Sequence, residues 1–314
     1  MGEGANRGPI AMIAAALCAA ALALPATASA ASGADLSPQA LFAGTTLSLK
    51  KGSAPRILGR VVLAGKVQVP WVNQTVSLAV RREGRLVVSR TVPVNPENGR
   101  FHASFRLKGC CDYVAQAIHN TDASAPIGLD VHAPRVLRPG REALLFNRLL
   151  AGAGYHMGDI SDRFDESTGL AVLAMRKVND LPRTEDYDPR LFEMLLRGRG
   201  AFEPVHDQPG RYVEVDLSRQ VMALIEDGKP ADVFHVSTGA FGTPTGTYSF
   251  YEKSPGYNQK GMYYSVYYSG NYATHGYYTV PNYPASHGCV RNPEVYSVFI
   301  YDWISLGDPI YIYE

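Results

Sequence analysis

Two histidines and one cysteine lie close together near the C-terminal end of the sequence. His275 precedes Gly276, and further along the chain His287 and Gly288 stand directly before Cys289. A cysteine attacks a carbonyl group as its thiolate. It therefore needs a base to take the proton, a group that fixes the tautomer of that base, and N–H donors where the oxyanion forms. This stretch can supply all three, so the sequence predicts a cysteine nucleophile that acts on a carbonyl group.

The residues next to this cysteine fit the same chemistry. Gly288 lets the backbone turn sharply and brings amide groups near Cys289, and Arg291 adds a positive charge that favours a thiolate or holds a carboxylate. The competing interpretation makes Cys289 a small buried hydrophobe and both nearby histidines partners of loop carbonyls; we favour the catalytic one. The remaining histidines are assigned that structural role: His102, His119, His132, His156, His206 and His235.

Tyrosines crowd the same part of the chain. Of the 19 tyrosines, 16 lie in residues 211–314, and nine of these fall between Tyr257 and Tyr283. A tyrosine ring offers a flat apolar face with a hydroxyl group at its tip, which suits a groove that holds a polar peptide or a sugar. A tyrosine-rich pair of strands with solvent-facing rings is the alternative. We expect a groove, with Tyr283 among the residues that bind the substrate.

Three parts of the sequence together resemble a known enzyme family. The string ASHGCVR at 285–291, the upstream pair His275-Gly276 and the string STGAFGTPTGTYSF at 237–250 are similar to the L,D-transpeptidase catalytic domain, known as the YkuD fold. In that family a cysteine attacks the carbonyl group of a peptidoglycan stem peptide next to a D-amino acid. The terminal D-residue leaves, and the acyl group passes to an amine of another stem. Carbapenems acylate the same cysteine.

The resemblance implies a role for each matching residue. Cys289 would be the nucleophile and His275 the general base, with its ring oriented by the carbonyl group of Gly276. His287, Gly288 and the amide of Cys289 would line the oxyanion site. The residues expected to bind the substrate or support its loop are Ser286, Arg291, Gly276 and Tyr283. No cofactor is implied.

Two other functions stay open at this point. An L,D-carboxypeptidase would use the same nucleophile with water in place of the acceptor amine, and the first half of the reaction would be identical. A non-catalytic protein that binds the cell wall would keep the domain without its activity. The expected partner in each case is peptidoglycan, as donor and acceptor stem peptides for an enzyme.

Apolar patterning divides the chain into three folded segments of a mainly β, α+β multidomain protein. Residues 41–133 alternate apolar and polar positions, which predicts about seven short strands in an immunoglobulin-like β-sandwich. Residues 137–200 have helical periodicity, with Asp165 at the start of the middle helix, and resemble a small peptidoglycan-binding bundle of three helices. Residues 211–314 are rich in strands again, and Asp227-Gly228 predicts a tight hairpin in this mostly β catalytic domain.

Residues 1–30 have the pattern of a secretory signal peptide. Arg7 precedes an apolar run from Ile10 to Leu24, and small residues follow up to Ala30, after which we expect cleavage; Ala26 to Ala28 offer a second candidate site. The run is shorter than the roughly 20 apolar residues that cross a bilayer. We therefore expect export to the cell wall or a periplasm-like space, with no membrane attachment after cleavage. A formal net charge of +1 offers no basic field for nucleic acid.

Cysteine spacing argues against a metal site. Removal of the signal peptide leaves Cys110, Cys111 and Cys289, so one of them stays unpaired. The adjacent Cys110 and Cys111 could form a vicinal disulfide, pair between molecules or remain buried thiols. No cysteine and histidine have the spacing of zinc ligands, so we expect no metal.

Overall fold

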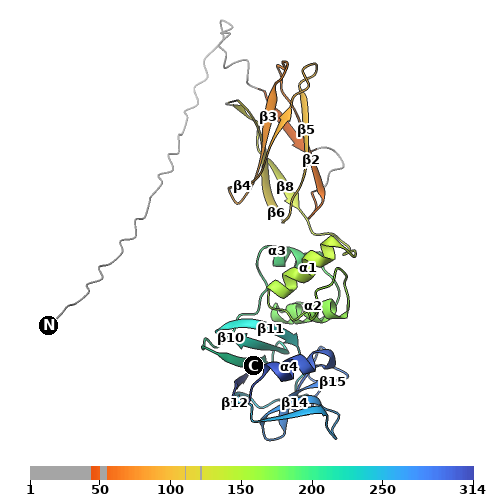
Figure 1. Cartoon of the computed structure of the whole chain (residues 1–314), viewed down its shortest axis with the longest axis vertical. Coiled ribbons are helices and arrows are strands. Elements are labelled where there is room, and N and C mark those ends of the chain that lie inside the picture. The colour runs from red at the N-terminus through yellow and green to blue at the C-terminus, as the bar shows by residue number, and fades with distance from the viewer. Residues whose placement is uncertain (1–43, 50–54, 110, 121) are drawn as a thin grey trace, which may run out of the picture. The chain divides into compact units, whose positions relative to one another are not determined.

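The computed structural model describes residues 44–49, 55–109, 111–120 and 122–314 of the chain (Figure 1). The predicted signal peptide lies outside these residues. Among the helices of the described residues, none combines the length and the apolar character that a bilayer crossing requires.

Two antiparallel sheets make up the segment that precedes the helices (Figure 1). One has the order β1 (Thr46–Leu49), β2 (Arg60–Lys66), β5 (Arg100–Arg106). The other has the order β4 (Arg85–Pro93), β3 (Thr75–Arg82), β6 (Cys111–His119), β7 (Asp122–Ala123), and β8 (Ile127–Val131) also pairs with β6.

The two sheets bury their apolar residues against each other. On β5, Phe101, Ala103 and Phe105 are buried and alternate with more exposed residues, as the period of a strand requires. Buried clusters combine residues of both sheets, such as Leu78 of β3 with Phe101. This is the packing of a β-sandwich. Its immunoglobulin-like character stays a prediction.

Cys111 at the start of β6 is disulfide-bonded, and its partner lies outside the described residues. Cys289 is the free cysteine of the described residues. Of the outcomes left open by the sequence, a free Cys111 thiol is therefore excluded.

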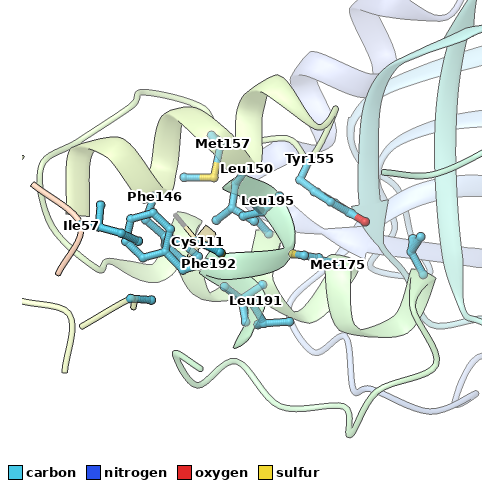
Figure 2. Close-up of a cluster of buried hydrophobic side chains, with 14 of the residues drawn as sticks. Ile57, Cys111, Phe146, Leu150, Tyr155, Met157, Met175, Leu191, Phe192 and Leu195 are labelled. Atoms are coloured by element: carbon cyan, nitrogen blue, oxygen red, sulfur yellow. The ribbon is translucent and has the colours of Figure 1, made fainter. Parts of the chain in front are cut away.

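Three helices follow: α1 (Arg141–Gly152), α2 (Glu166–Val178) and α3 (Pro189–Leu196). Asp165 caps α2 as predicted, because its side chain accepts a hydrogen bond from the Thr168 N–H at 3.0 Å. Figure 2 shows apolar side chains of the three helices gathered into one cluster, including Phe146 and Phe192, whose ring centroids are 5.1 Å apart.

The helices share their buried cluster with strands on both sides, from Ile57 and Phe105 of the preceding segment onward. Their buried cluster continues into the strands that follow, through Tyr212, Ala223 and Val233. The physical reason is that α2 is buried at every position from Ala171 to Val178, a surface larger than α1 and α3 alone cover. The adjoining sheet completes that cover.

The remaining residues form two further sheets. The first has the order β11 (Lys229–His235), β10 (Val221–Glu226), β9 (Arg211–Asp216), β17 (Pro309–Tyr313), β12 (Gly246–Ser249). The second has the order β13 (Glu252–Tyr257), β14 (Tyr263–Ser269), β15 (Tyr272–Tyr277), β16 (Val290–Pro293), and is followed by a 3-10 turn (Glu294–Tyr296) and α4 (Ser297–Trp303). The pairs β17–β9 and β15–β16 are parallel.

The central strands of the first sheet are buried on both faces. On β10, Met222 and Leu224 join the cluster formed with the second sheet and α4, whereas Ala223 and Ile225 join the cluster of the helices. Burial on both faces explains the continuous apolar run of this strand. The predicted hairpin is confirmed: Asp227 and Gly228, both with positive φ, connect β10 to β11.

Candidate active site

A cavity of about 460 Å³ lies beside β15 and β16. His275 and Cys289, the two residues on which the predicted chemistry depends, both line it. Cationic, hydroxyl, amide and aromatic groups share the lining, and one methionine is the aliphatic exception. The lining consists of Lys260, Met262, Asn271, Tyr272, His275, Tyr277, Ser286, His287, Cys289 and Arg291.

Parallel pairing of β15 with β16 brings the histidine and the cysteine to this cavity. His275 is the register partner of Arg291, and Thr274 is the partner of Val290. Side chains two residues apart in a strand share a face, so Cys289, directly before β16, lies on the same side as Arg291 and His275. Strand register therefore unites side chains that are separated along the chain.

The His275 ring is fixed as a neutral base. Its Nδ1 atom is 2.9 Å from the carbonyl oxygen of Gly276. A carbonyl group only accepts hydrogen bonds, so Nδ1 carries the proton and Nε2 keeps a free lone pair. Burial lowers the pKa of His275 to about 4, and the nearby Arg291 charge adds to this, although the Gly276 hydrogen bond opposes it. At neutral pH the ring can therefore accept a proton at Nε2.

The Cys289 sulfur is a protonated thiol at rest. Burial raises the pKa of Cys289, against the opposing effects of a backbone hydrogen bond from Ala273 and the positive charges of Lys260 and Arg291. The Sγ atom donates a long hydrogen bond of 3.7 Å to the carbonyl oxygen of Asn271. Within the described residues it makes no hydrogen bond with His275, so the resting state holds no thiolate–imidazolium pair. The thiol proton must be removed as the reaction starts.

A sharp turn precedes the sulfur. Gly288 has a φ of +122°, and a Cβ atom there would lie 2.3 Å from a ring carbon of Tyr272, so only glycine fits. The Gly288 N–H donates to Ser286 Oγ at 3.0 Å, and the Ser286 hydroxyl donates to the Cys289 carbonyl oxygen at 2.6 Å. Gly288 thus shapes the turn, and its amide is already engaged.

Two amides at this turn remain available to an oxyanion. The N–H groups of His287 and Cys289 make no hydrogen bond to the described residues. An amide beside the nucleophilic sulfur can donate a hydrogen bond to the carbonyl oxygen, which becomes an oxyanion when the carbon is attacked. His287 is exposed and lines the same cavity. Of the residues predicted for the oxyanion site, His287 and Cys289 therefore have a backbone N–H without a partner among the described residues.

Arg291 is held from several directions. Its backbone exchanges two hydrogen bonds of 2.9 Å with Ser237. Its guanidinium donates to the Ala285 carbonyl oxygen at 3.2 Å, and the guanidinium carbon lies 4.0 Å from the centroid of the Tyr277 ring. The positive charge is therefore fixed at the cavity wall, where Lys260 adds a second one.

Two residues predicted to bind substrate do not line the cavity. Gly276 serves through its carbonyl group, and a Cβ atom there would collide with Ser297. Tyr283 is 59% exposed, and its carbonyl oxygen accepts a hydrogen bond from Ser237 Oγ at 2.8 Å. The structure thus brings together Cys289, His275, His287, Ser286 and Arg291, and sets Gly276, Gly288 and Tyr283 outside the lining.

Five lining residues were missed by the sequence reasoning. Tyr272 and Tyr277 belong to the tyrosine cluster that indicated a groove, so the signal was present but not resolved to single residues. Lys260 and Asn271 lie in turns between strands, and Met262 directly precedes β14; no local pattern marks them. Within the described residues, no group of three or more His, Cys, Asp or Glu side chains could hold a metal ion.

Comparison with known proteins identifies the catalytic segment. The family model of the L,D-transpeptidase catalytic domain, YkuD, matches residues 210–312. The solved structure of an L,D-transpeptidase from Xylanimonas cellulosilytica is similar with 28% sequence identity and a TM-score of 0.53, over 57% of this chain and 97% of that one. The part of this chain that matches the structure is longer than residues 210–312, so the structural similarity also includes residues before 210.

Two further structures are more distant. An L,D-transpeptidase from Stackebrandtia nassauensis is 21% identical over 56% of this chain and 92% of that one, with a TM-score of 0.36. One from Mycobacterium tuberculosis is 10% identical over 86% of this chain and 98% of that one, with a TM-score of 0.32. At these TM-scores neither likeness bears on the fold. No curated protein matches the chain. Residues 210–312 form an L,D-transpeptidase catalytic domain of the YkuD type.

Proposed function

We propose that this protein is an exported cysteine L,D-transpeptidase that cross-links peptidoglycan stem peptides through a thioacyl-enzyme. The observation that carries the proposal is the cavity shared by a free cysteine and a neutral histidine with an unoccupied Nε2 lone pair. The catalytic domain at 210–312 supports peptidoglycan as the substrate.

The first half-reaction forms a thioester. As Cys289 Sγ attacks the donor carbonyl carbon, His275 Nε2 takes the thiol proton. The oxyanion that forms accepts a hydrogen bond from the Cys289 N–H. The C–N bond to the terminal D-residue then breaks. The His275 imidazolium gives its proton to the departing amine, so the ring returns to its neutral state and the acyl group stays on sulfur.

The second half-reaction transfers the acyl group. The amine of an acceptor stem attacks the thioester carbon and gives a proton to His275 Nε2. The C–S bond breaks, and the sulfur recovers that proton from the imidazolium. One peptide bond has been broken and one formed, which requires no external energy source and no cofactor.

Two cationic side chains at the cavity wall can bind the carboxylate at the end of the donor peptide. The released D-residue carries a carboxylate, and a guanidinium binds a carboxylate through charge-assisted hydrogen bonds. Arg291 is fixed in place for this contact by Tyr277 and Ala285, and Lys260 reinforces the positive field. We therefore assign carboxylate binding to Arg291.

The test is incubation of the full-length mature protein with tetrapeptide stems, followed by mass spectrometry. A transpeptidase forms cross-linked dimers, whereas an L,D-carboxypeptidase forms only tripeptides. Cys289→Ala should form neither product. Dimers at an equal rate with the Cys289→Ala variant would contradict a cysteine nucleophile.

Export and wall binding complete the proposal. Residues 1–30 would direct the chain out of the cytoplasm, which N-terminal sequencing of the mature protein tests: a start at Ala31 is expected, and an intact Met1 would contradict cleavage.

The segment 137–200 would bind the wall. Full-length Cys289→Ala protein should then co-sediment with insoluble peptidoglycan, and its complete absence from the pellet would contradict wall binding.

A further inference from the structure

A lysine of the helical segment is buried against the catalytic sheet. Lys177 of α2 is only 1% exposed, which is rare for a lysine unless its ammonium group is fully engaged. Its Nζ atom lies 3.0 Å from the Gln220 carbonyl oxygen, 2.9 Å from the Val236 carbonyl oxygen and 2.8 Å from His235 Nδ1. All three partners are acceptors. Lys177 therefore joins α2 to the end of β11.

His235 extends this link to the segment that follows β15 and leads toward the cavity. Its Nε2 is 2.9 Å from the carbonyl oxygen of Val280. Because that oxygen only accepts, Nε2 carries the ring proton and Nδ1 accepts from Lys177. Lys177, His235 and Val280 thus form one continuous chain of hydrogen bonds.

A second link reaches the same chain segment from the loop after α2. The Arg183 guanidinium donates to the Asn282 carbonyl oxygen at 3.1 Å and to the Ser218 carbonyl oxygen at 2.8 Å. In return, the Asn282 side-chain amide donates to the Arg183 carbonyl oxygen at 2.6 Å. Arg183 therefore holds Asn282 directly, and Lys177 reaches Val280 through His235.

The segment they hold, residues 278–285, begins and ends at the cavity. Tyr277, directly before it, and Ser286, directly after it, both line the cavity. Tyr277 packs on the Arg291 guanidinium, and the Ala285 carbonyl oxygen accepts a hydrogen bond from that same group. Within the segment, the Ala285 carbonyl therefore contacts Arg291 directly, and Tyr277 at the end of β15 joins the other end of the segment to the same guanidinium.

We propose that Lys177 and Arg183 are positioning residues of the catalytic site, which hold residues 278–285 and thereby fix the Arg291 guanidinium for the donor carboxylate. The helical segment then contributes to substrate binding by positioning a residue of the catalytic site. This inference rests on the proposed function for the identity of the substrate, but the holding of residues 278–285 is independent of it.

The first experiment measures the mobility of the segment. Backbone order parameters from ¹⁵N relaxation are recorded for Thr279, Val280 and Asn282 in the full mature protein and in Arg183→Ala. We expect values near about 0.85 in the parent and a fall below about 0.6 in the variant. Lys177→Met is the second variant, and thermal unfolding reports whether it folds. Arg190→Ala, which alters an exposed arginine of α3, is the matched control and should leave the order parameters unchanged.

The second experiment separates positioning from general damage. With tetrapeptide stems as donor, Arg183→Ala should raise KM about tenfold and change kcat by less than about twofold. Alkylation of Cys289 by iodoacetamide should keep its parent rate, because the β15–β16 pair holds the sulfur independently of this segment. Arg190→Ala should behave as the parent in both assays.

The outcomes are distinct. Unchanged order parameters in both variants, or a mobile segment with an unchanged KM, would overturn the inference. Equal losses in kcat, in the alkylation rate and in thermal stability would also overturn it, because the two residues would then only support the fold. A parent protein without activity on stem peptides contradicts the proposed function instead, and the order parameters still decide whether Lys177 and Arg183 hold the segment.

Discussion

Two buried histidines on neighbouring sheets differ in a single hydrogen bond. His275 and His235 are 3% and 2% exposed, and each donates one ring N–H to a backbone carbonyl group. Burial is the main cause that lowers the pKa of His275 to about 4 and that of His235 to about 3, so both rings are neutral at pH 7. His235 uses its second nitrogen to accept from Lys177, whereas the second nitrogen of His275 has no such partner among the described residues.

This contrast shows what makes a base out of a buried histidine. Burial keeps the imidazole unprotonated in both places, and a backbone carbonyl sets the tautomer in both places. Only at the cavity does a lone pair remain for a reacting proton. The hydrogen-bond partner of the second nitrogen therefore decides between a base and a structural link.

The largest effect on the acylation rate is expected from a substitution that removes the free lone pair of His275. His275→Gln keeps a polar side chain of similar length but no basic nitrogen, so acylation of Cys289 should slow by about 10²- to 10⁴-fold. The measurement is single-turnover formation of the acyl-enzyme by intact mass spectrometry, with a carbapenem as the acylating agent. A rate within threefold of the parent would show that another group, with His287 as the first candidate, acts as the base.

The next effect concerns the turn that presents the sulfur. Gly288→Ala places a Cβ atom against the Tyr272 ring at a φ that favours glycine. The free energy of unfolding should fall by about 1–3 kcal/mol, and the acylation rate should fall as well. Chemical denaturation measures the first and intact mass the second. Gly270→Ala is the matched control: Gly270 also has a positive φ, but no atom lies near its Cβ position. Equal effects at the two glycines would show that the contact with Tyr272 contributes nothing.

A smaller effect is expected at the serine of the same turn. Ser286→Ala leaves the buried Gly288 N–H without its acceptor and the Cys289 carbonyl without its donor. The free energy of unfolding should fall by about 1–2 kcal/mol, with a weaker loss of acylation rate than in Gly288→Ala. Ser286→Thr retains a hydroxyl group and should recover part of the stability. A full loss of activity at unchanged stability would instead assign Ser286 a direct role in the chemistry.

The smallest effect is predicted at the other histidine. His235→Gln offers one acceptor to Lys177 and one donor to Val280, so it can retain both links. The acylation rate should stay within about threefold of the parent, and thermal unfolding should shift by only a few degrees. A loss as large as that of His275→Gln would remove the distinction between the two sites.

Local patterns in the sequence predicted the parts of the site that lie close together in the chain. The turn from Ser286 to Cys289 and the hairpin at Asp227-Gly228 are marked by their own glycines, because a glycine accepts the positive φ that each turn requires. The tyrosine cluster indicated a groove because its composition alone is unusual. The family resemblance supplied His275 as the partner of Cys289.

Features that depend on long-range pairing were not predictable. Lys260 and Asn271 lie in the turns on either side of β14, and the pairing of β14 with β13 and β15 and of β15 with β16 brings those turns to the cavity; no local pattern encodes such a register. Lys177 lies on the helix face that packs on β11, where a lysine is not expected, and its three acceptors come from distant parts of the chain. For the same reason, the merging of the helical core with the catalytic sheet was missed.

The pH dependence of Cys289 acylation tests the central claim most directly. Above the His275 pKa of about 4 the ring is neutral and can take the thiol proton, so the parent rate should stay level from about pH 5 to 8 and fall only in more acidic solution. In His275→Gln only the thiolate reacts, and burial raises the pKa of Cys289, so its rate should climb about tenfold per pH unit over that range. The same steep climb in the parent would show that His275 takes no proton from the sulfur.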